Sequence, residues 1–547
     1  MLRKICALVL AMALLASAFA CTSVQEDSSS ETNNTDTSAS SDLQSSGTDA
    51  SENEDDTEST EEASGGVLRI VTAGKGSGIG FPAGFTGYYE RIYSDPALES
   101  LARIGEDKTS VEPWLAEDIS VDAQALTMVV TLREGIQFSD GTPFNAEAVV
   151  KNWNYYIENG SNRFNNVESF EATGEYEVTA YLSEYDNSTV LNTCVEGGWM
   201  VSPTFYEENG DDVVYTTPVG TGPFVCVSSN LDSEIVYEKN ENYWQEGKPY
   251  LDGIEITLCN DATTAVTIMK SGDADIILFP SVTQAQELEE LGFQQLGSAD
   301  AYFPSTAGFT FSSNVEGSPV SDVNVRKAIC YAIDSQGITK ALGGELYEFT
   351  NQLAVPGSES YNDQVAGYPY DPEKARELLE EAGYGDGCTI TATGSGSEAE
   401  SFFTLIQAYL AEVGITLEID LVDSAVYNAK RMVAGDDTYD GLIFLQGAAV
   451  KERYFDMFGE NPTHYARSMA QYDDVNSLMD IIKYSTDEEE VHQALMDFQQ
   501  KIIDEYCLIH PMYISGYLMY GTENVKDSGL METHKGWWTP ADCKLTQ

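Results

Sequence analysis

The chain has few positive charges and very little histidine. Its 547 residues include 28 Lys and Arg against 90 Asp and Glu, with four His, and the formal net charge is -62. A nucleic-acid backbone is bound by clusters of Lys and Arg, and the sequence contains no such cluster, which excludes nucleic acid as a main partner. The acidic excess is typical of the solvated surface of an exported protein, with attraction of cationic solutes as the alternative.

The sequence also lacks the short motifs of common catalytic and metal sites. It contains no CxxC, HExxH or GxSxG, and its four histidines are not spaced as a helical metal pair. We therefore expect no metal and no other cofactor, and we expect each histidine to be a surface or packing residue. A Ser or Cys nucleophile is not excluded, because its partners can come from distant parts of a chain. The histidines are His464, His492, His510 and His534.

Cysteines are scattered without regular spacing, and seven of the nine follow residue 66. An odd number leaves at least one thiol unpaired unless two chains are linked. Buried unpaired thiols, in a reducing or anaerobic habitat, are the interpretation that we favour. No disulfide framework is predicted.

Residues 1–20 have the pattern of an export signal. Arg3 and Lys4 precede an apolar run that ends at Ala20 and is short for a membrane span. The residues up to Cys21 resemble a bacterial lipoprotein cleavage site, which implies that Cys21 is lipidated and anchors the protein on the extracytoplasmic face of the cell membrane. Ordinary secretory cleavage is the alternative.

The segment after Cys21 predicts a disordered linker. Residues 22–66 are rich in Ser and Thr and carry 13 acidic and no basic residues. So few apolar side chains cannot offset the entropy lost on ordering, and self-repulsion keeps such a segment extended. We therefore expect residues 21–66 to join the anchor to the folded part.

The most informative stretch is 132–150. Apolar residues alternate with polar ones up to Leu132, which predicts a half-buried strand, and Asp140-Gly141 then predicts a turn. Asn145 is placed to cap a helix whose apolar stripe includes Val149 and Trp153.

Several motifs of the sequence resemble those of the family 5 extracellular solute-binding proteins, the receptors that deliver peptides, nickel complexes or other solutes to ABC importers. The first set of matching residues comprises Pro113, Leu115, Ala116, Leu132, Arg133, Phe138, Asp140, Gly141, Phe144 and Ala146. Further matches are 218–224 (PVGTGPF), 242–244 (NYW), 250–254 (YLDGI), 271–275 (SGDAD) and 325–334 (VRKAICYAID). The resemblance covers nearly all of residues 67–545.

The resemblance implies a two-lobed, periplasmic-binding-protein-like α/β fold with mixed sheets, an additional inserted small domain and a cleft between the lobes. We expect lobe I to comprise 67–110, 215–305 and 516–547, the inserted small domain of lobe I to be 111–214, and lobe II to be 306–515. Two chain crossings between the lobes would form a hinge that closes around a solute.

Periodicity and turn signals predict further elements. Expected helices are 89–103, 261–271, 323–342, one that begins at Asp371-Pro372, and 401–413. Expected strands are 67–72, 176–182, 224–227, 254–258, 275–279 and 415–422.

Six residues are predicted to bind the solute: Phe81, Phe85, Trp199, Tyr439, Gln446 and Lys451. In the family, the loop that contains Phe81 and Phe85 lies at the ligand cleft; a flexible loop without this role is the alternative. Trp199 is either a wall of the site or a core residue.

The segment 439–452 departs from the pattern of many peptide-binding relatives. There, a Trp follows the Tyr-Asp strand and an Asp three residues later accepts the ammonium group of the peptide; the equivalent positions here are Gln446 and Ala449. Without this carboxylate, the usual charge-assisted hydrogen bonds to a peptide N-terminus are absent. Lys451 and Arg453 either attract an anionic solute or belong to a solvated loop. Asp440 is expected to support the end of its strand.

These features favour a substrate-binding lipoprotein of an ABC importer, not an enzyme, that delivers a peptide or similar small solute to a permease. The expected partners are the solute, the permease subunits and the membrane through its lipid anchor, and the expected state is a monomer. Two alternatives stay open: a surface sensor for a signalling peptide without transport, and a surface hydrolase that uses the cleft.

Overall fold

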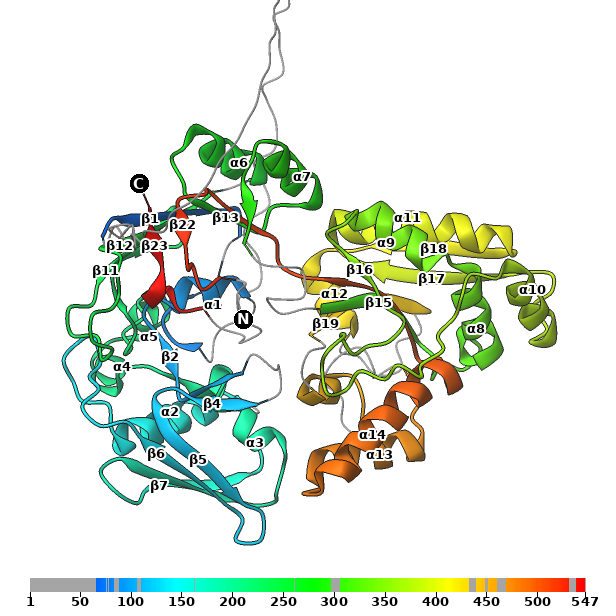
Figure 1. Cartoon of the computed structure of the whole chain (residues 1–547). Coiled ribbons are helices and arrows are strands. Elements are labelled where there is room, and N and C mark those ends of the chain that lie inside the picture. The colour runs from blue at the N-terminus through cyan, green and yellow to red at the C-terminus, as the bar shows by residue number, and fades with distance from the viewer. Residues whose placement is uncertain are drawn as a thin grey trace, which may run out of the picture. The chain divides into compact units, whose positions relative to one another are not determined.

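The computed structural model describes most of the chain beyond residue 64. The chain divides into two units, Met1–Thr60 and Glu61–Gln547, and all described residues belong to the second. They are 65–74, 76, 78–82, 88–105, 110–161, 163–259, 261–296, 305–431, 439–447, 451–459, 469–530 and 538–546. Three larger sheets organise this unit (Figure 1).

The first sheet has seven strands, and β1 (Val67–Thr72) lies inside it. β1 pairs in parallel with β12 (Gly253–Leu258) and β13 (Ile276–Leu278), and β13 pairs antiparallel with β21 (Met519–Gly521). The other strands are β10 (Phe224–Asn230), β11 (Glu234–Lys239) and β14 (Gln294–Gln295). Helices α6 (Ala262–Ser271) and α7 (Val282–Glu290) pack their buried faces against Val71 and Ile277. We call this sheet and its helices the first lobe; it unites segments from both ends of the described chain.

The second sheet has six strands in the order β16-β20-β15-β19-β17-β18. Its central strand β15 (Ser305–Phe311) is buried along its whole length, which is typical of a strand covered on both faces. The other strands are β16 (Glu348–Phe349), β17 (Cys388–Gly394), β18 (Ile415–Leu421), β19 (Gly441–Gly447) and β20 (Ile509–Ser515). The associated helices are α8 (Val323–Ala332), α9 (Ser335–Gly343), α10 (Pro372–Glu381), α11 (Gly396–Glu412), α12 (Ser424–Arg431), α13 (Asp473–Tyr484) and α14 (Glu488–Gln500). We call this part the second lobe.

The third sheet confirms the predicted strand, turn and helix. Its strand β6 (Thr127–Leu132) alternates between half-buried and buried residues, with Met128, Val130 and Leu132 on the buried face. Asn145 caps α2 (Ala146–Glu158) by accepting a hydrogen bond from the Ala148 N–H at 3.0 Å. The other strands are β5 (Ala116–Asp122), β7 (Val167–Ala172) and β8 (Glu177–Leu182), and the short helices that follow are α3 (Ser188–Leu191), α4 (Pro203–Glu208) and α5 (Asp211–Thr216). We call this part the inserted domain.

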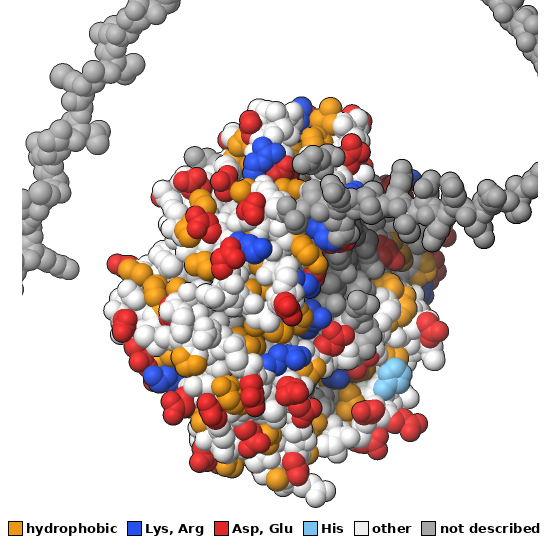
Figure 2. All heavy atoms as spheres, turned by 60° about the vertical axis from the view of Figure 1, so that its left-hand side comes forward, with side chains coloured by type: hydrophobic (Ala, Val, Ile, Leu, Met, Phe, Trp, Pro, Cys, Tyr) orange, Lys and Arg blue, Asp and Glu red, His pale blue; other side chains and the backbone are white. Residues whose placement is uncertain are grey.

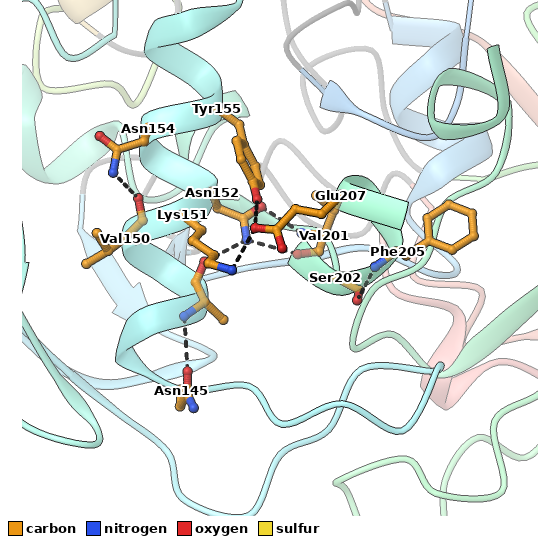
Figure 3. Close-up of polar contacts among 11 residues, drawn as sticks. Asn145, Val150, Lys151, Asn152, Asn154, Tyr155, Val201, Ser202, Phe205 and Glu207 are labelled. Carbon is orange, nitrogen blue, oxygen red and sulfur yellow. Dashed lines mark hydrogen bonds and ion pairs between the residues drawn. The ribbon is translucent and has the colours of Figure 1, made fainter. Parts of the chain in front are cut away.

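Polar contacts fix α2 to the segment around α4 (Figure 3). The Asn152 amide donates to the Val201 carbonyl and accepts from the Val201 N–H, at 2.9 and 3.0 Å. On the exposed side, the Glu207 carboxylate accepts from Lys151 at 2.6 Å and from Tyr155 at 2.8 Å. Asn152 is buried, and these two bonds satisfy both its amide N–H and its amide oxygen. The contact therefore sets the register between α2 and the segment that contains Val201.

Three predicted helices are wrong in extent; the one expected over 401–413 begins earlier, at Gly396. Instead of running over 89–103, α1 (Tyr88–Ser94) stops before Pro96, which disfavours helical backbone at the preceding residue, and the chain continues as β2 (Glu99–Ser100) and β3 (Ala102–Ile104). The predicted helix 323–342 breaks at Ile333, which has extended backbone. Asp334 starts a new helix there, because its side chain accepts the Gly337 N–H at 2.9 Å.

A buried carboxylate joins several of the sequence motifs. Glu99 is 1% exposed, and each of its oxygens accepts two hydrogen bonds. Trp114 Nε1 and the Tyr243 hydroxyl donate to Oε1 at 2.9 and 2.8 Å, and Trp244 Nε1 and the Thr221 hydroxyl donate to Oε2 at 3.0 and 2.7 Å. Burial raises the pKa of Glu99, although these four donors oppose the shift.

No disulfide bond joins any of the seven cysteines among the described residues, and five of them are buried. Cys330 and Cys507 lie closest, with 3.4 Å between their Sγ atoms. The fully buried Arg326 donates to the carbonyls of Tyr506 and Cys507, which holds this turn of chain against α8. The expectation of buried unpaired thiols agrees with this arrangement.

The surface is strongly acidic, as the net charge requires. Figure 2 shows Asp and Glu side chains scattered over one face, with fewer Lys and Arg between them. Among the described residues, no helix has both the length and the apolar character needed to cross a membrane.

We predict that Glu99→Gln lowers the free energy of unfolding by about 2–4 kcal/mol, because the amide nitrogen of Gln would face two of the four donors and leave them without an acceptor. Urea denaturation measures this change. The matched control is Glu117→Gln on the exposed part of β5, where we expect a change within about 0.5 kcal/mol. Equal stability of the two variants would show that the Glu99 contacts contribute nothing.

Candidate functional site

The inserted domain and the second lobe meet at a polar seam, which we define as Tyr185–Asn187 together with Glu359, Lys451 and 482–485. Residues 185–187 follow β8, the second strand from the edge of the third sheet, and 482–485 include the C-terminal end of α13. Lys451 opens the short helix η4 (Lys451–Asp456), a few residues after the end of β19. The seam therefore lies where a loop of one sheet meets helix ends of another.

Asn187 makes the most contacts across the seam. Its backbone N–H donates to the Lys483 carbonyl at 2.8 Å. Its Nδ2 donates to the carbonyls of Ile482 and Ser485 at 2.9 and 3.0 Å. Within its own loop, its Oδ1 accepts from the Tyr185 hydroxyl at 2.6 Å.

An ion pair lies beside these hydrogen bonds. Lys483 Nζ is 3.4 Å from Asp186 Oδ2, and the Asp186 side chain is only 8% exposed. Burial by itself would lower the pKa of Lys483, but its contacts with Tyr484 and Asp186 outweigh burial and raise it. Lys483 is therefore held in its charged form.

A second lysine belongs to the same seam. Lys451 Nζ pairs with Glu359 Oε1 at 2.9 Å, and both side chains are largely buried. Burial raises the pKa of Tyr185, and the positive charge of Lys451 opposes this shift. The Lys451 ammonium therefore acts electrostatically on Tyr185 across the seam. A partly buried ammonium group such as that of Lys451 is suited to binding a carboxylate.

The structure places Phe81 and Trp199 inside the protein. Phe81 is 0% exposed, with its ring centroid 5.3 Å from that of Tyr156 and 5.1 Å from that of Tyr206. Trp199 is 1% exposed, and the Arg91 guanidinium lies 4.4 Å from the centroid of its ring. Both rings are packing residues in this state of the protein, and a role as solute walls stays a prediction.

The residues predicted on the second lobe are divided between core and seam. Tyr439 is 2% exposed and its hydroxyl donates to the Lys430 carbonyl at 3.3 Å. Gln446 pairs with Thr306 in the register of β19 and β15. Only Lys451 of the predicted residues with described side chains lies at the seam. Phe85, Ala449, Cys21, His464 and His534 lie outside the described residues.

Asp440 supports its strand, as expected. Its Oδ2 accepts the Thr391 N–H at 2.7 Å, and its Oδ1 accepts a hydrogen bond from the Ser318 hydroxyl. These contacts join the start of β19 to the middle of β17, so this carboxylate is used within the second lobe.

The Ser335–His510 pair is the described arrangement most similar to a nucleophile with a base. Ser335 Oγ lies 3.0 Å from His510 Nε2. Burial lowers the pKa of His510 to about 4, and the adjoining cavity has a volume of about 10 Å³, room for a water molecule but not for a substrate. This pair therefore gives no support to hydrolysis. Within the described part of the chain, no group of three or more His, Cys, Asp or Glu residues is arranged to hold a metal.

Most residues of the seam have no recognisable signal in the sequence. The sequence pattern of residues 185–187 is that of an ordinary polar loop. The residues that Asn187 contacts lie almost 300 positions later in the chain. Lys451 was predicted because it follows a strand that resembles a ligand-binding strand of the family.

A family model described as bacterial extracellular solute-binding proteins, family 5 Middle, matches residues 110–461. Its members are solute-binding proteins and not enzymes. The chain is 32% identical over 336 residues to the glutathione-binding protein GsiB of Salmonella typhi, a match that covers 58% of this chain and 63% of that protein. The corresponding protein of Escherichia coli (strain K12) is 32% identical over 318 residues, covering 57% and 61%. The matches thus span less than two thirds of these relatives.

Solved structures confirm the two-lobed α/β fold. The substrate-binding protein CtaP from Listeria monocytogenes has a TM-score of 0.77 at 19% identity, covering 88% of this chain and 100% of that chain. The protein DppA from Helicobacter pylori, in complex with the peptide STSA, has a TM-score of 0.74 at 20% identity, covering 89% and 99%. AgaA from A. tumefacien R10, in complex with agropinic acid, has a TM-score of 0.73 at 23% identity, covering 88% and 99%.

The buried carboxylate of Asp95 is expected to make the stability of the fold depend on pH. Asp95 is 2% exposed, accepts the Trp538 N–H at 2.8 Å, and has a pKa that burial raises to about 7 against the opposing charge of Arg91. Between its unfolded pKa of about 4 and this value, the folded state binds more protons than the unfolded state, so stability falls as pH rises.

We therefore predict that the stability of the wild type relative to Asp95→Asn falls between pH 4 and 7, by at most about 4 kcal/mol, and is constant above pH 7. Urea denaturation across this range measures the difference. Asp118→Asn, at an exposed position of β5, is the control and should show no such dependence. A constant difference between wild type and Asp95→Asn would contradict the assignment.

Proposed function

Because the chain belongs to the family 5 bacterial extracellular solute-binding proteins, we propose that it is the substrate-binding component of an ABC importer. It captures a peptide or similar small solute between its two lobes and delivers it to the permease subunits. The polar seam is the observation that supports this function, because it places a partly buried lysine, Lys451, where the second lobe meets the inserted domain. Sites between domains are common places for small ligands.

The solute that fits the seam is a small molecule with at least one carboxylate. Lys451 binds this group by exchanging its contact with Glu359. The names of the similar proteins agree with this chemistry, since they bind glutathione, a peptide or agropinic acid. Ala449, in place of a carboxylate, leaves a peptide ammonium without its usual partner, so the amino end of the solute is recognised in another way.

The remaining parts of the proposal follow from the N-terminal sequence. Cys21 carries the lipid anchor, 22–66 is the acidic linker, and the folded unit works as a monomer on the extracytoplasmic face of the membrane. The acidic surface keeps the protein soluble and dispersed. A sensor without transport would share all these features and would differ in having no permease genes beside its own.

We predict that the full chain, purified from its own host, carries one small carboxylate-bearing solute per molecule. Native mass spectrometry gives the stoichiometry, and denaturation followed by mass analysis identifies the released compound. If the protein is empty, calorimetric titration with glutathione and with short peptides replaces this measurement. Binding of a solute without any carboxylate, or turnover of the bound compound, would contradict the proposal.

We predict that Lys451→Met weakens binding of that solute about 10- to 100-fold, because a hydrogen bond to a charged group contributes about 1.5–3 kcal/mol. Isothermal titration calorimetry measures the loss. Lys270→Met is the matched control, since Lys270 also pairs with a glutamate, Glu287 at 2.6 Å, but on the first lobe away from the seam. Equal affinity of the two variants would exclude Lys451 from the site.

A further inference from the structure

The C-terminal end of α13 is completed by a residue of another domain. The last carbonyls of a helix have no partner within it and need one elsewhere. In α13, the Ser485 N–H bonds back to the Ile481 carbonyl. The next two carbonyls, those of Ile482 and Lys483, accept from the side chain and the backbone of Asn187, respectively. The inserted domain thus supplies a cap to a helix of the second lobe.

The capping loop is held in shape by its own contacts. The Tyr185 hydroxyl donates to Asn187 Oδ1, which turns the amide so that its N–H groups point toward α13. Asp186 Oδ1 accepts the N–H and the hydroxyl of Ser188 at 2.8 and 2.7 Å. Because these bonds lie within the inserted domain, the loop does not depend on the second lobe for its conformation, and little entropy is lost when the two meet.

The ion pair adds a second contact of the same kind. Asp186 has its Oδ2 directed to Lys483, and the Lys483 ammonium lies 5.0 Å from the ring centroid of Tyr484 and 5.9 Å from that of Phe455. The two rings belong to the second lobe and the Asp186 carboxylate to the inserted domain, and all three lie around the Lys483 ammonium. Each group that makes these contacts is a residue of the chain, so none of them requires a solute.

We propose that Tyr185–Asn187 form a clasp that closes the inserted domain onto the second lobe whether or not a solute is bound. The consequence for affinity rests on the proposed function: an apparent dissociation constant equals the intrinsic one divided by the fraction of protein in the competent state. A clasp that raises the closed fraction before binding therefore raises affinity without touching the solute. Asn187, Asp186 and Lys483 are positioning residues for binding, distinct from Lys451.

Chemical crosslinking of the solute-free full chain tests the clasp. A carbodiimide joins a carboxylate to an amine only when the two are in contact, so Asp186 and Lys483 should give a crosslinked peptide pair detectable by mass mapping. We expect Asn187→Ala to reduce this crosslink at least fivefold, because the side-chain cap on α13 is lost. The Lys270–Glu287 crosslink within the first lobe serves as an internal standard, since its 2.6 Å contact is unrelated to closure.

Asn159→Ala is the matched control. Asn159 Nδ2 also donates to a carbonyl in the last turn of a helix, that of Tyr155 at 2.8 Å, but helix and cap both belong to the inserted domain. This variant should leave the Asp186–Lys483 crosslink unchanged. If Asn187→Ala does not fold, Tyr185→Phe replaces it; removing the hydroxyl that orients Asn187 should reduce the crosslink at least twofold.

Three outcomes would overturn the proposal: no Asp186–Lys483 crosslink in the solute-free wild type, an unchanged crosslink in the folded Asn187 variant, or an equal loss in Asn159→Ala. The measurement contains no solute, so failure of the proposed transport function would leave it unaffected. Once a solute is identified, Asn187→Ala should weaken its binding severalfold, and unchanged affinity would show that the clasp has no influence on binding.

Discussion

The buried Glu99 carboxylate is the interaction on which the arrangement of the first lobe and the inserted domain depends. It is the first residue of β2 and accepts hydrogen bonds from Trp114, Thr221, Tyr243 and Trp244. These donors come from three segments separated by up to 130 residues, and the indole N–H groups of Trp114 and Trp244 each have one fixed direction in which they can donate. A buried charge is stable only when its hydrogen bonds are complete, so the three segments have a single acceptable arrangement around it. Trp114 precedes the four-stranded sheet of the inserted domain and Thr221 follows its short helices, so Glu99 joins the two chain segments that lead into and out of that domain.

Among the described residues, the second lobe contacts the rest of the unit through groups of different character near the chain crossings and at the seam. Near the chain crossings, Leu346 of the second lobe packs with residues of α6 and α7, and Tyr517 contacts Phe279, so this contact is mainly apolar. At the seam, hydrogen bonds and ion pairs predominate, which water can replace at modest cost. The hinge keeps an apolar contact, while the polar contacts at the seam can be exchanged for water. Together they allow the lobes to open and close without unfolding. Lys451 belongs to the seam, where a solute can compete with Glu359 for contact with the lysine ammonium.

The fold class was predicted well from the sequence, because both the local hydrophobic and capping patterns and the family motifs indicate it. The alternation up to Leu132 and the cap at Asn145 were confirmed, since strand burial and helix capping are decided within a few residues. The break at Ile333 was missed because the apolar spacing continues across it, while the Asp334 side chain decides the local backbone. Phe81 and Trp199 show a further limit, because an aromatic residue has the same sequence signature in a core and in a wall of a site. The contacts of Asn187 could not be predicted at all, since they join residues almost 300 positions apart. The domain boundaries inferred from the resemblance stay a prediction.

The central claim is that a solute binds at the seam between the inserted domain and the second lobe. A crystal structure of the protein as purified from its host, without refolding, tests this most directly. We expect density for a small molecule at the seam, with a carboxylate on Lys451 and with Asn187 still capping α13. A molecule bound away from the seam, or one at the seam while Lys451 contacts Glu359 alone, would contradict it.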